Sequence, residues 1–540
     1  MPRGVTVLAR AAAILILFSS LFSYFRAPTS HLNAAPLVQN GQVIDVAAGG
    51  NLQQALNAVL PGGTIRLAAG ATYIGAFTLP AKNGSEFITI TTANAALPPA
   101  GTRIDPGYKP HLATIRSSST ISAMTTATGA SYYRFVGVAF EANQNGAGDV
   151  ITLGASATSV AQLPHHIALD RVLIQGDPVL GQKRGVSVNA AHVTIANSHI
   201  SGIKAVGQDS QAICGWNTPG PIVIRNNFLE AAGENIMFGG AGVSIAGIVP
   251  SDIVVEDNLL TKDLSWRGSS WTVKNLFELK HSRRVLVRRN VMVNNWAGAQ
   301  QGFAIVFTPR NSGGQPTSWV VEDVEFSGNI VAHSSSGFNL LGHDDLAPSG
   351  QLARVLIKNN LLYDIGMTWG GTGTFAQIGG EPRDITIDHN TVLHEGNIIT
   401  FYSGTYTNSS GVRVTGGPVA GLVITNNLIK HNAYGIFGNG QAYGNGSLTY
   451  YAPTATVLGN VIASDASVAS RYPAGNQFPS VSSFLASFGN AGSYDYRLRP
   501  TSPYLVAGTD GQDLGPAFGM LPATMAPLPP GRARVATMVW

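Results

Sequence analysis

The chain has 540 residues, only 11% of which are charged, and its formal net charge is +4. Three of the 33 basic residues, Arg3, Arg10 and Arg26, lie in an apolar leader, which leaves 30 basic against 29 acidic residues. A nearly neutral chain gives no electrostatic reason to expect a nucleic acid or a membrane surface as partner. Cys214 is the only cysteine, which excludes an intrachain disulfide and a cysteine-based metal site.

The N-terminal leader has the pattern of a targeting segment. Arg3 and Arg10 precede an apolar run over residues 11–25, which is too short for a comfortable transmembrane span. Residues 1–35 are therefore predicted to be a signal peptide, with an N-terminal anchor as the alternative. This predicts a secreted or periplasmic protein, outside a bacterial cytoplasm, with no membrane span in the mature chain.

Residues 36–130 are interpreted as an N-terminal cap and the first coils. Residues 51–60 carry apolar side chains at helical spacing, and the pattern ends before Pro61, Gly62 and Gly63. We expect a short amphipathic helix here that covers the open edge of the first strands.

Between residues 222 and 460 one short pattern recurs eight times: alternating aliphatic residues, two polar positions and an asparagine. The intervals between copies run from 30 to 39 residues, which is the length of one supersecondary unit. Ser198 ends an earlier, degenerate copy. The recurring asparagines are Asn227, Asn258, Asn290, Asn329, Asn360, Asn390, Asn427 and Asn460.

Each repeat holds a strand with alternating apolar residues, such as Val285 and Val287, followed by a second apolar strand. Two strands alone cannot bury an apolar face, but units stacked about 4.8 Å apart bury a continuous core. Asparagine suits this stack because its amide can bond to the same amide one coil away, and because it tolerates a left-handed corner. The sequence predicts an all-β fold, a single-stranded parallel β-helix (solenoid) over 131–465. A C-terminal closure over 466–520 and a flexible tail over 521–540 would follow.

Function is expected on an outer face, because side chains fill the interior of a narrow β-helix. The two longest intervals place extra residues after the second strand, in segments 308–319 and 402–417. Loops stacked on one side would form the walls of a groove, and such a groove suits an extended polymer.

The outward positions of the second strands carry mixed polar groups. Alternation predicts that Phe277 and Leu279 point into the core, so that Glu278 and Lys280 point out. A structural interpretation stands beside the functional one for each group: a surface ion pair, a loop anchor or turn chemistry. The catalytic candidates are Lys280, Arg310, Glu278, His343, Asp344 and Asp345.

Five of the seven tryptophans lie in or beside connections rather than in the alternating strands. An aromatic face in a loop is a good platform for a sugar ring. Polar residues at outward positions of later coils join them as substrate-binding candidates. These candidates are Trp266, Trp271, Trp296, Trp319, Trp369, Gln377 and Tyr402, and no metal ligand is assigned.

With its coil repeat, asparagine column and N-terminal helix, the chain resembles the right-handed parallel β-helix, or pectin-lyase-like, superfamily over roughly residues 43–515. Segments 233–240, 275–291 and 294–311 are similar to those of secreted bacterial β-helix proteins. The superfamily includes pectate, alginate and chondroitin lyases, glycosidases, epimerases and adhesins, so the resemblance implies a right-handed β-helix with a polysaccharide partner. Lys280 and Arg310 resemble the Lys base and Arg acid of alginate and chondroitin lyases in residue type and coil spacing. The calcium carboxylates of pectate lyases do not map cleanly onto this sequence, which leaves a calcium requirement open.

Three functions follow from these patterns. In β-elimination, Arg310 would stabilise the enolate of a uronate while Lys280 removes the C5 proton. In hydrolysis, acid and base would be two carboxyl groups drawn from Glu278, Asp344, Asp345 and Glu381. The third function is glycan binding by a non-catalytic surface scaffold. We expect a monomeric, carbohydrate-active protein, with a polysaccharide lyase first and a glycoside hydrolase second.

Overall fold

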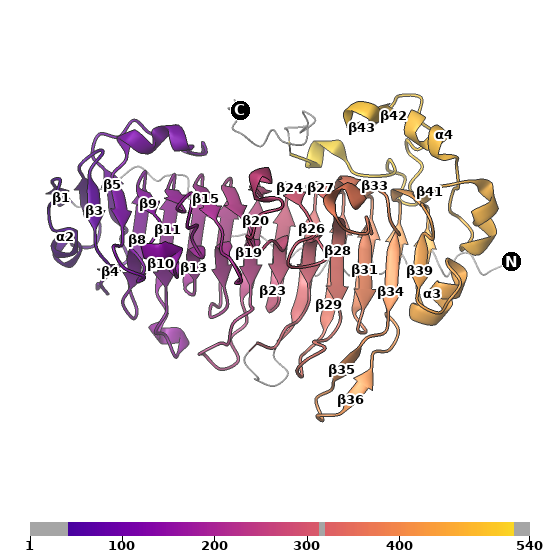
Figure 1. The fold of residues 1–540 in the computed structure, drawn as a ribbon, viewed down its shortest axis with the longest axis horizontal. Helices are drawn as coiled ribbons and strands as arrows, with labels where there is room; N and C mark the ends of the chain where they lie inside the picture. Colours follow the sequence, from indigo (N-terminus) through magenta and orange to yellow (C-terminus); the bar gives the residue numbers. More distant parts are fainter. Residues whose placement is uncertain (1–40, 313–318, 523–540) are drawn as a thin grey trace. The chain divides into compact units, whose positions relative to one another are not determined.

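The computed structural model describes residues 41–312 and 319–522. The predicted leader and the tail beyond residue 522 therefore lie outside the described residues, as do residues 313–318 of one predicted loop. The described chain winds into coils, and successive coils add one strand to each of three parallel sheets, here named sheets A, B and C (Figure 1).

Each sheet collects strands from along the whole described chain. Sheet A contains β1 (Val43–Val46), β2 (Thr64–Leu67), β5 (Ile88–Thr92), β8 (Ser131–Val136), β11 (His165–Asp170), β14 (Ala191–Ala196), β17 (Ile222–Arg225), β20 (Ser251–Glu256), β23 (Ser282–Arg288), β26 (Val321–Ser327), β29 (Leu352–Lys358), β32 (Arg383–Asp388), β37 (Val423–Thr425) and β40 (Thr456–Leu458). Sheet B contains β3 (Thr72–Ile74), β6 (Thr114–Arg116), β9 (Ala139–Glu141), β12 (Leu173–Gln175), β15 (His199–Ile203), β18 (Phe228–Ala231), β21 (Leu259–Thr261), β24 (Val291–Asn295), β27 (Ile330–Ser334), β30 (Leu361–Ile365), β33 (Thr391–His394), β38 (Leu428–Lys430) and β41 (Val461–Ala463). Sheet C contains β4 (Phe77–Leu79), β7 (Met124–Thr126), β10 (Asp149–Leu153), β13 (Arg184–Val188), β16 (Gln211–Gly215), β19 (Glu234–Phe238), β22 (Asn275–Leu279), β25 (Phe303–Phe307), β28 (Ser336–Leu341), β31 (Ala376–Gly379), β34 (Ile399–Tyr402) and β39 (Ile436–Gly438).

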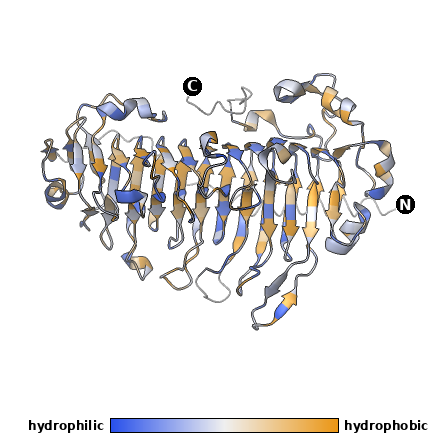
Figure 2. Ribbon diagram, viewed as in Figure 1, coloured by the Kyte–Doolittle hydropathy of each residue, from blue (hydrophilic) through white to orange (hydrophobic). Residues whose placement is uncertain are grey.

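The core is built from inward residues that stack on their equivalents one coil away. Val285 and Val287 of β23 pair with Ile253 and Val255 of β20, and all four are buried. Figure 2 shows apolar residues repeating along the strands from coil to coil. Because every coil repeats the same inward positions, one continuous apolar interior runs through the sheets.

The predicted second strands form sheet C, but the prediction of two strands per unit is wrong. A third strand, in sheet B, follows each recurring asparagine almost at once, as β18 follows Asn227. The strands of sheet B have only three to five residues. Such short strands carry too few residues for alternation to separate them from a corner.

The predicted asparagine ladder is present. Asn227 Nδ2 donates to Asn258 Oδ1 at 2.9 Å, and the same bond recurs at each coil as far as Asn460, which donates to Asn476. Each side-chain oxygen also accepts the backbone N–H of the preceding coil's asparagine, as Asn258 Oδ1 accepts from Asn227. The ladder therefore satisfies a column of buried polar groups at the corner between sheets A and B.

The left-handed backbone lies one residue earlier than expected. Positive φ occurs at Asn226 (52°), Asp257 (59°) and Arg289 (52°), each immediately before a ladder asparagine. The ladder residues are thus selected for their amide bonds, and the preceding residue makes the sharp turn.

A column of alternating charge runs across the outer side of sheet A. Arg284 Nε donates to Asp252 Oδ1 at 2.7 Å, and Arg354 Nε donates to Asp323 Oδ1 at 2.5 Å. Register places Asp252, Arg284, Asp323, Arg354 and Asp384 on five consecutive coils. The basic run near residue 284 is therefore neutralised by acids of adjacent coils and forms no single basic patch.

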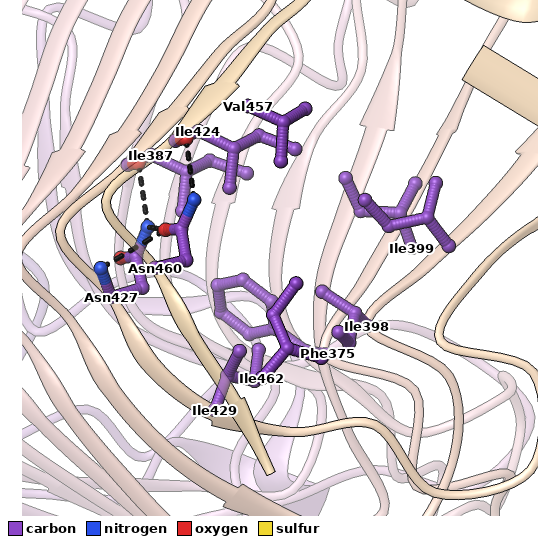
Figure 3. Close-up of a pocket in the computed structure, with 11 residues that line it drawn as sticks. Phe375, Ile387, Ile398, Ile399, Ile424, Asn427, Ile429, Val457, Asn460 and Ile462 are labelled. Atoms are coloured by element: carbon purple, nitrogen blue, oxygen red, sulfur yellow. Dashed lines mark hydrogen bonds between the residues drawn. The ribbon is translucent and has the colours of Figure 1, made fainter. Parts of the chain in front are cut away.

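A small void of about 10 Å³ lies in the core near the C-terminal coils. Isoleucines line it, together with Asn427 and Asn460, whose amides donate to the carbonyls of Ile387 and Ile424 (Figure 3). A space of this size is a packing gap rather than a binding pocket.

The ends of the coil stack are covered by irregular segments. The predicted N-terminal helix is present as α2 (Leu52–Ala58), capped by Asn51, and it buries Leu52, Ala55 and Leu56 in the core. Near the C-terminus lie α3 (Asn445–Tyr451), α4 (Val481–Ala486) and the hairpin β42 (Phe488–Asn490)–β43 (Asp495–Leu498), with Phe484 and Phe488 packed on residues of sheet B. In residues 41–312 and 319–522 no helix has the length and apolarity needed to cross a membrane.

Candidate functional site

The outward positions of sheet C form two parallel rows of side chains, here called the sheet C face. One row runs through Met237, Glu278, Val306, Asn339, Gln377, Thr400 and Phe437, which are register partners on consecutive coils. A second row, three positions earlier, runs through Arg184, Gln211, Glu234 and Asn275. Since neighbouring coils lie about 4.8 Å apart, side chains along each row can touch.

The second row is a connected polar network. Arg184 Nε donates to Gln211 Oε1 at 2.7 Å, and Gln211 Nε2 donates to Glu234 Oε2 at 2.8 Å. Lys274 Nζ lies 3.4 Å from Glu234 Oε1 and 2.5 Å from Asp209 Oδ1. Burial raises the pKa of Glu234, and the charges of Glu278 and Asp209 raise it further, while nearby lysines oppose the rise.

Glu278 and Lys280 point outward as predicted, but only Lys280 reaches solvent. The Glu278 side chain is 2% exposed, and its Oε2 accepts from Asn275 Nδ2 at 3.0 Å. Lys280 Nζ lies 3.5 Å from Glu278 Oε1, and its side chain is 15% exposed. The pair is therefore a partly buried ion pair whose cation faces outward.

Beneath these two rows lies a fully buried lysine. Lys262 Nζ donates to the carbonyl oxygens of Ala231, Ala232, Gly233 and Asn275 at 2.7–3.0 Å. Its bonds join the turn before β19 to the start of β22, the strands that carry Glu234 and Asn275. Lys262 thus fixes the backbone on which the second row is mounted.

Arg310 lies one coil beyond Lys280 and is held by two acids. Its backbone N–H donates to the Lys280 carbonyl at 2.9 Å, which places the two residues on adjacent coils. Arg310 Nη1 is 3.0 Å from Asp344 Oδ1 and also contacts Asp345 Oδ1. Asp344 is buried and accepts the N–H of Leu346, two residues on, at 3.0 Å, so the turn interpretation also holds for this residue. Its other oxygen accepts the N–H of Asn311 at 2.7 Å. The Arg310 side chain stays 30% exposed.

His343 belongs to a neighbouring cluster rather than to the Arg310 pair. Its ring stacks on Tyr406 of the hairpin β35 (Thr405–Thr407)–β36 (Arg413–Thr415), which projects along the lower edge of Figure 1. Tyr406 donates to Glu381 Oε2 at 3.1 Å. Burial lowers the pKa of His343, and the charge of Glu381 opposes that shift.

Gln377 and Tyr402 lie on the sheet C face, as predicted. Gln377 Nε2 donates to Asn339 Oδ1 at 3.4 Å, within the same row. Burial raises the pKa of Tyr402, whereas the charge of Arg310 and a hydrogen bond with Gln377 lower it. Both side chains are partly exposed, so they can still meet a ligand.

Four of the five predicted tryptophan platforms are closed. Trp266, Trp296 and Trp369 pack together in a buried cluster, and Trp319 is fully buried against His281, with ring centroids 4.6 Å apart. Only Trp271 is partly exposed, beneath the ammonium of Lys204 at 4.7 Å. Large aromatic residues in these connections bury their faces against neighbouring coils, so the four do not present open faces to a sugar.

Open aromatic rings occur elsewhere on the same face. Tyr434 is 53% exposed, and its ring centroid lies 5.2 Å from that of partly exposed Phe437. Phe437 ends the row that contains Glu278. Alternation in the β39 segment could have revealed this pair, since Ile436 points inward.

The sequence interpretation also missed Arg184, Gln211, Glu234 and Lys274. The strand register was the signal that could have revealed these residues. When the segment that ends at Phe238 is aligned with the segment that ends at Leu279, Glu234 falls opposite Asn275. This register was hidden because Leu276 and Phe277 both face the core, which interrupts strict alternation and turns Asn275 outward.

The fit of these residues to calcium can be judged from their oxygens. Glu234 Oε1 and Asn275 Oδ1 are buried and lack hydrogen-bond partners within the described chain. However, the Lys274 ammonium lies 3.4 Å from Glu234 Oε1, where a bound cation would have to sit. Residues 41–312 and 319–522 also hold no group of three His, Cys, Asp or Glu side chains able to bind a metal. The residues as they stand do not fit a calcium site.

Three long parallel sheets closing around one core define a right-handed parallel β-helix. No family model and no curated protein matches the chain. Among solved structures, a mutant of the PL6 family alginate lyase AlyGC has a TM-score of 0.52 at 15% identity, covering 90% of this chain; the chain spans 57% of that structure's length. A mannuronic acid specific family 6 lyase from human gut microbiota has a TM-score of 0.49 at 12% identity, over 82% of this chain and 91% of the other. The catalytic domain of a GH87 alpha-1,3-glucanase has a TM-score of 0.43 at 10% identity, over 82% and 68%. At these identities the likeness concerns the fold alone.

Proposed function

We propose that this protein is a carbohydrate-active β-helix protein that cleaves a uronate-containing polysaccharide by β-elimination on the sheet C face. One observation carries the proposal: the candidate base and the candidate cation both reach solvent, whereas the carboxyl groups of Glu278 and Asp344 are buried. The two partly exposed candidates, Asp345 and Glu381, are engaged by Arg310 and Tyr406. The side chains of Lys280 and Arg310 are 15% and 30% exposed, while those of Glu278 and Asp344 are 2% and 4% exposed.

Elimination assigns a separate task to each exposed basic residue. Lys280 first loses its ammonium proton to water and then, as the neutral amine, removes the C5 proton of the uronate. A C4–C5 double bond forms as the C4–O bond breaks, and the leaving oxygen takes a proton from water. Arg310 faces the uronate carboxylate and stabilises the charge that develops on it. Asp344 and Asp345 hold the guanidinium in place before the substrate arrives.

Hydrolysis is the second candidate, and the pair Glu234 and Glu278 favours it. Two interacting carboxyl groups, one with a raised pKa, are the equipment of a glycosidase. The pair ranks second because both carboxyl groups are buried and already engaged by amides and lysines. Glycan binding without cleavage is the third candidate, and the exposed rings of Tyr434 and Phe437 favour it.

A panel of uronate polymers, including alginate, and neutral glycans separates the three functions. Elimination yields an unsaturated uronate end that absorbs ultraviolet light, hydrolysis yields reducing ends without it, and a scaffold yields neither. For the lyase, Lys280→Ala abolishes the ultraviolet signal while the protein stays folded, whereas Arg284→Ala on sheet A leaves it unchanged. A Lys280→Ala variant with full elimination activity contradicts the proposed site.

A further inference from the structure

We propose that Lys274 and Lys280 are built-in counter-ions of the carboxylates on the sheet C face, so that this face needs no divalent cation and binds one only when Lys274 is removed. The proposal concerns the charge balance of the face. It does not depend on which polysaccharide is bound or cleaved.

The negative charges of the carboxylates on the sheet C face need nearby positive charges, because these carboxylates lie close together and away from water. Glu234 is fully buried and Glu278 is 2% exposed, and the two lie on adjacent coils, where the charge of Glu278 helps to raise the pKa of Glu234. Asp209 adds a third acid beside Glu234. Like charges that share a desolvated site destabilise the fold unless cations or protons offset them.

Lys274 is placed to supply most of that compensation. It precedes β22, and its backbone N–H is fixed to the Ala232 carbonyl at 3.2 Å. Its ammonium bridges Asp209 and Glu234, and its side chain is only 14% exposed. Lys280 serves Glu278 in the same way at 3.5 Å. Two ammonium groups therefore stand among three carboxylates.

The surrounding oxygens would otherwise suit a hard cation. Glu234 Oε1 and Asn275 Oδ1 belong to register partners on adjacent coils, are buried and have no hydrogen-bond partner within the described residues. Carboxylate and amide oxygens are the ligands that calcium prefers. An ammonium within about 4 Å of a divalent ion repels it strongly in a desolvated site, so Lys274 excludes the metal that these oxygens could hold.

The test is thermal unfolding of the full chain in EDTA and in increasing calcium chloride. For the wild type, we expect one melting temperature in both media and no calcium binding by titration calorimetry. For Lys274→Ala, we expect a lower melting temperature in EDTA and an upward, saturable shift with calcium. The double variant Lys274→Ala/Glu234→Gln should lose that shift.

Lys358→Ala is the matched control, because Lys358 also pairs with a buried acid, Asp388 at 2.8 Å, but on sheet A. It should be destabilised without responding to calcium. A wild-type protein that loses stability in EDTA or binds calcium overturns the proposal, as does a folded Lys274→Ala variant with no calcium response. If Lys274→Ala does not fold, the wild-type measurements and Lys274→Gln decide the question. None of these readouts uses a polysaccharide, so the outcome is separate from that of the lyase assay.

Discussion

Asn290 donates its side-chain amide to Asn329 Oδ1 at 3.0 Å, although the two residues are 39 positions apart. Its own side-chain oxygen accepts both the backbone N–H and the amide of Asn258. One side chain thus joins three consecutive coils at the corner between sheets A and B.

We expect Asn290→Ala to lower the free energy of unfolding by about 2–4 kcal/mol, because it leaves several buried polar groups unpaired. Thermal and urea unfolding measure the effect. Asn57→Ala, at an exposed position of α2, is the control and should change little. Equal stability of both variants would show that the ladder does not contribute.

Lys262→Met should destabilise the protein by about 2–4 kcal/mol, because it strips buried carbonyl oxygens in the turn before β19 and at the start of β22 of their donor. Lys109→Met is a suitable comparison, since Lys109 forms a partly exposed pair with Glu141 and should matter far less. A Lys262→Met protein as stable as the wild type would mean that water replaces the ammonium.

Asp388 should give the protein part of its acid sensitivity. Burial tends to raise the pKa of Asp388, but bonds from His389 and Lys358 hold it below the usual value of 3.8. The folded state therefore releases this proton more readily than the unfolded state. The resulting stabilisation is complete above roughly pH 5, where the unfolded carboxyl is also ionised, and is lost as the pH falls through the folded pKa.

Asp388→Asn should accordingly lower the free energy of unfolding at pH 6, with the difference from the wild type shrinking below pH 4. Urea unfolding between pH 3 and pH 6 measures this. Asp45→Asn, in an exposed pair with Arg66, should behave like the wild type. A difference that is independent of pH would rule out the ionised carboxylate as its source.

Arg310→Ala should lower kcat/KM on an acidic polymer by about 10²–10³, because the exposed guanidinium faces the developing charge. Arg310→Lys should recover part of this loss, since it keeps the charge without the fork that Asp344 and Asp345 hold. Steady-state kinetics with Arg284→Ala as control measures both. Unchanged kcat/KM in Arg310→Ala would remove Arg310 from the proposed mechanism.

Tyr434→Ala and Phe437→Ala should each weaken binding of a long glycan by about fivefold, the loss expected for one aromatic stacking contact of about 1 kcal/mol. Tyr450→Ala is the matched control, because Tyr450 is 57% exposed but lies on α3. Equal binding by all three variants would show that the sheet C face does not extend to β39.

The coil period, the asparagine ladder and the inward direction of Phe277 and Leu279 could all be predicted, because one spacing repeats many times in the sequence. The burial of Trp319 could not be predicted, because the sequence pattern of a tryptophan in a connection is the same whether its ring packs on His281 or faces solvent. The network around Glu234 was also hidden. Successive residues of its row, from Arg184 to Asn275, lie 23 to 41 residues apart in the sequence. They meet only through the strand register, which strict alternation does not reveal because Leu276 and Phe277 both point inward.

The charge column on sheet A restricts how this protein can change in length. Losing a single turn of the solenoid, the one that carries Arg284, would set Asp252 directly against Asp323, and two like charges face to face are unfavourable. Losing two turns together would instead bring Asp252 beside Arg354 and keep the alternation. The charges on this surface of sheet A therefore keep alternating only if coils in this region are lost or gained in even numbers.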